Sequence, residues 1–242
     1  MTNALLMSSS RMGSLGYLEH AASQLTTILD GTSRKVLFVP FAAVSFSYDS
    51  YEDLAAPPFA AVDAELTAIH RFEDPVRAVR EADVIAVGGG NSFALLNRLY
   101  GAGLVSEIRE RVTQHGARYI GWSAGTNVAT PSIRTTNDMP IVEPPSFGAI
   151  GLVPFQINPH FIPGKPAGHN GESREERLAE FTAINQGEEV LGLIEGSALH
   201  VTGSTGTILG DSDALVFAQD APVRTIAAGS SFELAEISGP VA

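Results

Sequence analysis

The chain has no cysteine among its 242 residues. This absence excludes a disulfide framework, a thiolate nucleophile and any metal site with cysteine ligands. Long apolar runs are also missing, since no stretch approaches the roughly 18 apolar residues of a membrane span. The start "MTNALLMSSSR" has neither the basic residues nor the apolar length of a signal peptide. We therefore expect a cytoplasmic protein with no membrane partner.

Positive charge is scarce as well. Lysine and arginine number 15 against 27 aspartates and glutamates, which gives a net charge of −12. Binding to nucleic acid needs a basic surface, so we expect no nucleic-acid partner. An acidic chain can still bind an anionic substrate, because charges are screened beyond about 8 Å at physiological salt and a few arginines in a pocket outweigh them locally.

Short apolar segments alternate with helical ones over the first half of the chain. Strand-like runs occur at 35–41, 65–72, 83–90 and 117–122, and helical spacing occurs at 16–29, 75–82, 91–100 and 104–116. This order predicts an α/β fold with a doubly wound parallel sheet. Beyond a loop-rich stretch after Pro131, we expect a helix at 174–186, a strand at 190–197 and C-terminal β-hairpins from 198 onward. No linker is evident, so 1–242 is expected to form a single domain.

The segment "GWSAG" at 121–125 fits G-x-S-x-G, the pattern of a serine on a sharp turn between a strand and a helix. The apolar run at 117–122 supplies the strand that this context requires. Flanking glycines let the two backbones approach each other closely. Ser123 is therefore the candidate nucleophile, and the amide of Ala124, at the start of the following helix, is a candidate oxyanion donor.

A second motif, "GGGNS" at 88–92, lies where the run 83–90 ends. Ligands of a doubly wound sheet bind at the carboxyl ends of its strands, so this motif and Ser123 are expected at the same edge. An amide of Gly89 or Gly90 can supply the second oxyanion donor, and Asn91 can contact the substrate. A phosphate-binding turn or a turn that only packs is the alternative reading.

A serine nucleophile needs a base, and the chain has six histidines. His160 ends an apolar strand in "QINPHF", which makes it the favoured base, and His169 in "GHNGE" is the runner-up. Surface or packing roles are assigned to the other four, which are His20, His70, His115 and His200. A zinc site at His160, His169 and Glu172 is the metal hypothesis, but no H-E-x-x-H occurs and we expect no metal.

The base in turn needs a carboxylate that orients it. Asp138 in "TTNDMP" and Glu195 at the end of "VLGLIEG" both fit, and their spacing does not choose between them. The structural alternatives are an Asx turn at Asp138 and a solvated strand end at Glu195.

Five motifs in order resemble the peptidase E family, the bacterial aspartyl dipeptidases: "VGGGNSF", "YIGWSAGTN", "IRTTNDMPIV", "QINPHF" and "GESREER". The resemblance covers nearly the whole chain, from "SYDSYED" to "GLIEG". It implies a flavodoxin-like α/β fold akin to that of class I glutamine amidotransferases. It also implies a cytoplasmic serine exopeptidase that hydrolyses dipeptides with an N-terminal aspartate, without a metal or cofactor. We expect a monomer or a homodimer.

This resemblance assigns roles to the candidate residues. The family's nucleophile falls on Ser123 and its base on His160, while the third member falls on Asp138 or Glu195. We favour Glu195, because it would emerge from the end of a sheet strand. Asp138 is the serious second candidate, and it can act in the site without touching the histidine.

The substrate's own charges need partners as well. A carboxylate suits a bidentate arginine, for which Arg174 at a helix start is the first candidate and Arg134 the second. Asp138 or Glu143 is the candidate acceptor for the substrate ammonium.

The sequence departs from the family pattern at Pro57-Pro58, which we expect to interrupt a helix. Isoleucine in place of the family's proline before Glu195 is expected to shift the local backbone slightly. Two other functions stay open: a cyanophycinase-like serine hydrolase of aspartyl-arginine polymer, and a non-catalytic ligand-binding member of the fold.

Overall fold

The computed structural model describes residues 1–165, 168 and 170–239. Its large sheet has eight strands in the order β12-β9-β8-β1-β5-β4-β2-β3. The parallel part contains β1 (Asn3–Met7), β2 (Lys35–Val39), β3 (Glu65–Ala68), β4 (Val84–Val87) and β5 (Arg118–Trp122). The antiparallel edge contains β8 (Ala198–Thr202), β9 (Thr205–Leu209) and β12 (Ser231–Glu233). The predicted doubly wound sheet with C-terminal hairpins is confirmed.

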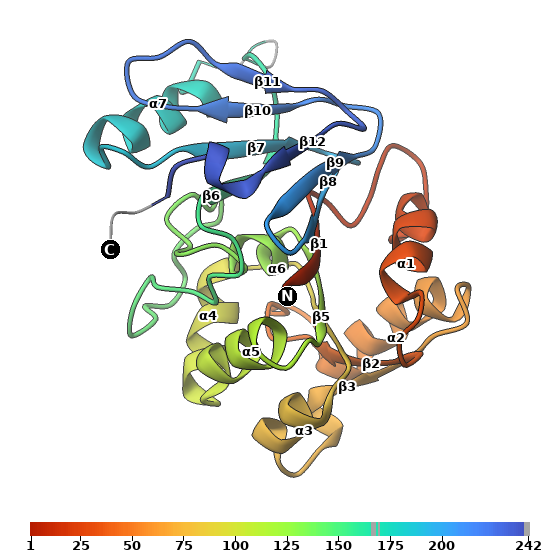
Figure 1. Ribbon diagram of the computed structural model, residues 1–242. Coiled ribbons are helices and arrows are strands. Elements are labelled where there is room, and N and C mark those ends of the chain that lie inside the picture. Colours follow the sequence, from red (N-terminus) through yellow and green to blue (C-terminus); the bar gives the residue numbers. More distant parts are fainter. Residues whose placement is uncertain (166–167, 169, 240–242) are drawn as a thin grey trace.

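Helices cover both faces of this sheet (Figure 1). One face holds α1 (Ala22–Leu29) and α2 (Tyr48–Ala60), and the other holds α3 (Pro75–Glu81), α4 (Ser92–Gly101) and α5 (Leu104–Thr113). Successive side chains of β4 alternate between these two cores, as the pleat of a strand requires. All four side chains of β4 are buried, which explains its continuous apolar sequence.

A second, smaller sheet was not foreseen from the sequence. It runs β11-β10-β7-β6, with β6 (Gln156–Phe161), β7 (Val190–Ile194), β10 (Ala214–Phe217) and β11 (Arg224–Ile226). Strands β6 and β7 are parallel neighbours. One side of the small sheet packs into the same core as α4 and α5, and α7 (Arg174–Ile184) packs on the other side (Figure 1).

Two local predictions were wrong. The strand expected at 65–72 ends at Ala68 and passes into a 3-10 turn at Ile69–Arg71, because the pairing with β2 ends at Phe38 and Ala68. The helix expected to break at Pro57-Pro58 is continuous.

This helix, α2, survives because of where its lost hydrogen bonds fall. Each proline leaves a carbonyl four residues earlier unpaired, and those carbonyls belong to exposed Asp53 and Leu54, where water can bind them. Buried Tyr51, Ala55 and Phe59 hold the opposite face of the helix on the sheet.

Three further short elements complete the described part of the chain. They are a four-residue α6 (Ala124–Asn127) and 3-10 turns at Glu19–Ala21 and Leu234–Glu236. No helix within the described ranges is both long and apolar enough to cross a membrane.

Candidate active site

Ser123 lies on the sharp turn between β5 and α6. Its backbone adopts φ 55° and ψ −114°, a conformation that a residue with a side chain rarely holds unless its surroundings impose it. A Cβ at Gly121 would lie 2.6 Å from the Gly125 carbonyl oxygen, and a Cβ at Gly125 would collide with the carbonyl of Val87. Both flanking glycines are therefore required by close backbone packing, as the G-x-S-x-G pattern predicts.

The glycine loop after β4 passes directly beside this serine. A Cβ at Gly89 would approach the Ser123 Cβ to 2.9 Å, and Gly90 has a φ of 137°, which favours glycine. Within the described residues, the amides of Gly89 and Gly90 have no hydrogen-bond acceptor. The amide of Ala124 begins α6 and therefore has no acceptor within its helix. These unpaired amides lie next to Ser123 in the chain or in the adjacent loop, which makes them candidate oxyanion donors.

His160 and Glu195 come from the two parallel strands of the small sheet. The register between β6 and β7 shifts between Asn158 and Phe161, so a bulge includes His160, whose φ is 54°. Bulges re-aim a side chain, and this one turns the imidazole toward the end of β7. There His160 Nδ1 lies 2.6 Å from Glu195 Oε1. The side chains are 36% and 53% exposed, so this pair is only partly shielded from water.

Asp138, the other candidate for the orienting acid, has different hydrogen-bond partners from Glu195. Its Oδ2 accepts from the amide of Ser92 at 2.7 Å and from the Thr136 hydroxyl at 3.1 Å. Among the described residues, it has no hydrogen bond to His160. The carboxylate therefore caps the start of α4, and Glu195 is the group that contacts the histidine.

These elements enclose one cavity of about 350 Å³. Its lining includes the serine, the histidine and both carboxylates, which come from four separate segments of the chain. The lining residues are Ser92, Ser123, Ala124, Thr136, Asn137, Asp138, Pro159, His160, Ile162, Arg174 and Glu195.

Arg174 also reaches this cavity. It begins α7 after Ser173, which forms a capping box with Glu176. Its guanidinium donates to Asn137 Oδ1, and burial lowers its pKa, with nearby Arg177 adding to the shift and Asp138 opposing it. Among the residues that the structure describes, this partly buried cation has one hydrogen bond, to a neutral side chain, and so has donors left for an anionic ligand.

Other substrate-contact candidates are engaged elsewhere. Arg134 binds both oxygens of Glu188 at 2.7 and 2.8 Å and stacks on the Phe181 ring, so its guanidinium is occupied outside the cavity. The Asn91 side chain caps α4 and donates to the Met139 carbonyl. In both residues, contacts within the folded chain use the polar atoms that the sequence offered for ligand binding.

Glu143 and Glu172 are also absent from the lining of this cavity. Glu143 lines a neighbouring pocket with Phe93 and Phe147. His169 falls outside the described residues. Glu172 pairs with Arg177 at 3.7 Å.

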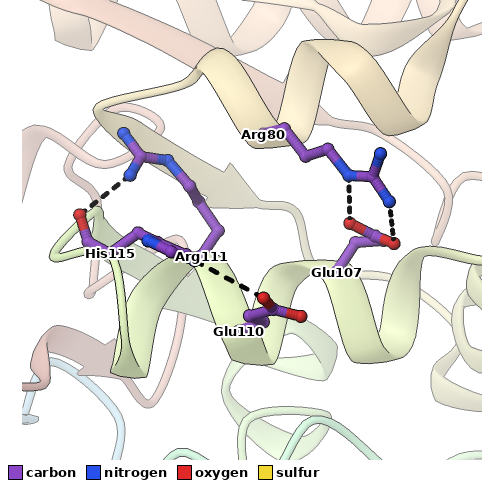
Figure 2. A pocket seen from close by; sticks show the side chains of 5 residues that line it. All are labelled: Arg80, Glu107, Glu110, Arg111 and His115. Carbon is purple, nitrogen blue, oxygen red and sulfur yellow. Dashed lines mark hydrogen bonds and ion pairs between the residues drawn. The ribbon is translucent and has the colours of Figure 1, made fainter.

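Two clusters of charged side chains outside this cavity are held by ion pairs within the fold. Asp49, Glu52 and His70 have ligand atoms within 4.8 Å of one another, but Arg71 bridges the two carboxylates and supplies the positive charge. Figure 2 shows a pocket between α3 and α5 in which Arg80 binds both oxygens of Glu107 at 2.7 Å. In the same pocket Arg111 donates to the carbonyl of His115, just after α5. It also donates to the carbonyl of Ala82, just after α3, at 2.8 Å, so both guanidiniums tie these helices together.

Ser8, at the end of β1, is a residue that sequence reasoning missed. Its buried hydroxyl donates to the Leu193 carbonyl at 2.7 Å and accepts from the amide of His160 at 2.9 Å. One side chain thus joins the end of β1 in the large sheet to β6 and β7 of the small sheet. A serine run directly after a buried strand was the available signal in the sequence.

We expect Ser8→Ala to lower the free energy of unfolding by about 1–3 kcal/mol, because a buried carbonyl and the His160 amide both lose their partner. Urea denaturation measures this change. Ser230→Ala removes an exposed hydroxyl that donates to Ala227 and is expected to change stability by less than about 0.5 kcal/mol. Equal unfolding midpoints for the two variants would contradict the bridging role.

Comparison with known proteins gives consistent matches. The family model described as Peptidase family S51 matches residues 4–209. "Peptidase E" of Pasteurella multocida (strain Pm70) is 49% identical over 234 residues, which cover 96% of this chain and 100% of that protein. "Peptidase E" of Shewanella sp. (strain ANA-3) is 48% identical over 228 residues, which cover 94% of this chain and 96% of that protein.

Solved structures share the fold. A peptidase from an acI-B1 Actinobacterium superimposes with a TM-score of 0.72 at 21% identity, covering 96% of this chain and 97% of that one. A putative peptidase E protein from Listeria monocytogenes EGD-e gives 0.65 at 22% identity, covering 88% of this chain and 100% of that one.

Proposed function

The chain belongs to peptidase family S51, and from this premise we propose that it is a serine exopeptidase that hydrolyses dipeptides with an N-terminal aspartate. One observation carries the mechanism: strained Ser123 and the hydrogen-bonded pair of His160 and Glu195 line the same cavity. Nucleophile, base and orienting acid are the three parts that acyl transfer by a serine requires.

The hydrogen bond between His160 and Glu195 sets the tautomer that this mechanism needs. A carboxylate only accepts, so Nδ1 carries the proton in the bond of 2.6 Å. Nε2 is then unprotonated and can accept the proton of Ser123 as the hydroxyl attacks the peptide carbonyl. His160 next donates that proton to the leaving amine, and an acyl-enzyme remains on Ser123.

The developing negative charge falls among backbone donors. The Ala124 amide and an amide of the Gly89-Gly90 segment bind the oxyanion, where fixed dipoles are worth more than in water. Water then attacks the ester while His160 takes one of its protons, and His160 gives that proton to the Ser123 oxygen as aspartate is released.

The substrate aspartate has a side-chain carboxylate, for which Arg174 is the proposed partner. Its position in the cavity, its partial burial and its remaining donors support this assignment. The carboxylate of Asp138, which also lines the cavity, is the proposed acceptor for the substrate ammonium. A cytoplasmic location and a monomeric or homodimeric state remain proposals from the sequence.

A panel of dipeptides tests the proposed function directly. We expect Asp-Leu to be hydrolysed and Ala-Leu, Lys-Leu and aspartyl-arginine polymer to be hydrolysed poorly or not at all. Cleavage of the polymer in preference to every Asp-X dipeptide would replace this proposal with a cyanophycinase-like activity. Absence of any hydrolysis together with no labelling of Ser123 by a fluorophosphonate would indicate a binding protein.

Arg174→Ala should reduce kcat/KM for Asp-Leu by roughly 10- to 100-fold, since a hydrogen bond to a charged group is worth about 1.5–3 kcal/mol. Residual hydrolysis of Ala-Leu should fall much less. Arg177→Ala, one turn along the same helix with a half-exposed side chain, is the matched control and should stay near wild type. An equal loss on both dipeptides would remove Arg174 from aspartate recognition.

A further inference from the structure

A buried chain of aromatic side chains lies behind the glycine loop. Trp122, immediately before Ser123, approaches the Tyr17 hydroxyl with its Nε1 at 2.8 Å and the Tyr51 hydroxyl at 3.2 Å. The two hydroxyls lie 3.0 Å apart, and the Tyr51 hydroxyl lies 2.8 Å from the carbonyl oxygen of Gly89. Trp122 and Tyr51 are 0% and 2% exposed. This network therefore connects the residue next to the nucleophile with the loop that holds the candidate oxyanion donors.

The direction of each hydrogen bond in this network is fixed by chemistry. A carbonyl only accepts, so Tyr51 gives its single hydroxyl proton to Gly89. Tyr17 must then donate to Tyr51, and the indole of Trp122, which is a donor only, serves the two tyrosines. Tyr51 is thus committed to the Gly89 carbonyl.

Holding this carbonyl also fixes the amide on the other side of the same peptide unit. In a planar trans peptide the C=O of Gly89 and the N–H of Gly90 point in opposite directions. The carbonyl is turned toward Tyr51 in the core under α2, so the Gly90 N–H is turned away from that core. Its partner is not found among the described residues.

Packing keeps the loop close to both Tyr51 and the nucleophile. A Cβ at Gly88 would lie 2.6 Å from the Tyr51 hydroxyl, and a Cβ at Gly89 would lie 2.9 Å from the Ser123 Cβ. At Gly90 a Cβ would collide with the Ala42 carbonyl. The loop therefore passes in close contact with Tyr51, Ser123 and Ala42.

We propose that Tyr51 is a positioning residue that orients the Gly89-Gly90 peptide, so that the Gly90 N–H is the second oxyanion donor. This inference rests on the proposed function, because it presumes acyl transfer at Ser123. It selects the amide of Gly90 over that of Gly89, the two donors between which the sequence did not choose. Burial also raises the pKa of Tyr51 well above its usual value, with Tyr17 adding to the shift, so the hydroxyl keeps the proton that it donates.

Tyr51→Phe removes only the hydroxyl that holds the Gly89 carbonyl. Losing one oxyanion donor outright costs about 10²- to 10³-fold in kcat, and a donor that is misaimed but present should cost about 10- to 100-fold. We expect this loss in kcat for Asp-Leu, with KM within about threefold of wild type, because the donor acts on the transition state. A purely structural defect would not produce this division between kcat and KM.

Tyr100→Phe is the matched control. Tyr100 on α4 also donates to a glycine carbonyl, that of Gly148, at 2.8 Å, and it does not line the active-site cavity. We expect it to keep kcat within about threefold of wild type. The inference is overturned if Tyr51→Phe keeps its kcat, if its loss lies wholly in KM, or if Tyr100→Phe loses as much.

An NMR measurement on the wild-type protein decides the matter even if Tyr51→Phe fails to fold. The probe is an aspartate analogue that has a boronic acid in place of the α-carboxyl group and keeps the side-chain carboxylate. Its boron forms a tetrahedral adduct with the Ser123 oxygen. We expect the amide proton of Gly90 to move downfield in this adduct, and a shift at Gly89 instead would overturn the assignment.

Failure of the proposed peptidase function can be distinguished from failure of the role proposed for Tyr51. A wild-type protein that neither hydrolyses Asp-Leu nor reacts at Ser123 with the fluorophosphonate would remove both ideas. If wild type hydrolyses Asp-Leu and Tyr51→Phe does so equally fast, only the role of Tyr51 fails.

Discussion

Ser123→Ala is expected to abolish Asp-Leu hydrolysis, with a fall in kcat of roughly 10⁶-fold by analogy with the nucleophile of a serine protease. The reason is that alanine leaves the cavity, the oxyanion donors and the pair of His160 and Glu195 in place but removes the atom that forms the acyl-enzyme. Initial rates at saturating Asp-Leu measure the change. Full activity in this variant would end the serine mechanism.

The fold of this variant should persist. Alanine retains the Cβ at Ser123, and the backbone amide still donates to the Met7 carbonyl at 3.1 Å. Circular dichroism and the unfolding midpoint should therefore match those of wild type.

Ser92→Ala is a useful comparison, because Ser92 also has a hydroxyl that lines the cavity. A fluorophosphonate should label wild type and Ser92→Ala but not Ser123→Ala. Labelling that disappears with Ser92 instead would identify the wrong serine as nucleophile.

The features around Ser123 could be predicted because they are local. The two glycines of "GWSAG" are required by contacts within the turn and with the neighbouring strand β4. The buried residues of β4 and β5 form the short uncharged runs VIAV and YIGW. The backbone conformation of this turn therefore follows from the residue types within it. The alternating strands and helices before it likewise determine a doubly wound sheet.

Spacing in the sequence could not choose the acid behind His160, although Glu195 was favoured over Asp138 as the end of a sheet strand. Its contact depends on β6 lying beside β7 and on a bulge at one position of that pair, and both are long-range features. Sequence spacing contains little information on such pairing, whereas a one-residue shift in register turns every side chain to the other face. Ser8 and Tyr51 were missed for the same reason, since their partners lie far away in the chain.

Two residues predicted to contact the substrate, Arg134 and Asn91, instead make contacts that hold the fold together. Arg134 and Asn91 have the chemistry of ligand-binding residues, yet Glu188 and the first turn of α4 occupy their polar atoms. Residue type alone cannot show which of two uses applies, because a buried partner such as Glu188 becomes visible only in the folded structure.

The second large effect is expected at Glu195. Glu195→Gln replaces the carboxylate on His160 Nδ1 with an amide, which can donate a hydrogen bond and so favour the wrong tautomer of the imidazole. Loss of a buried aspartate in this role costs about 10⁴-fold in kcat. Glu195 is 53% exposed, so water can partly replace it, and we expect a loss of roughly 10³- to 10⁴-fold.

Asp138→Asn is the matched variant for this prediction, because it makes the same change in the other carboxylate of the cavity. An asparagine oxygen can still accept from the Ser92 amide, so α4 keeps its cap. We expect kcat to fall less than about tenfold and KM to rise, because the ammonium of the substrate loses a negative partner.

Comparison of the two carboxylate variants in kcat and KM therefore assigns the third member of the triad. If Asp138→Asn loses as much kcat as Glu195→Gln, the contact between Glu195 and His160 is not what orients the base. If Glu195→Gln keeps kcat within about tenfold of wild type, the strained backbone of His160, held by Ser8, is sufficient to aim the imidazole. Only a large loss confined to Glu195 supports a Ser123–His160–Glu195 triad, since only that residue contacts Nδ1 in the described part of the chain.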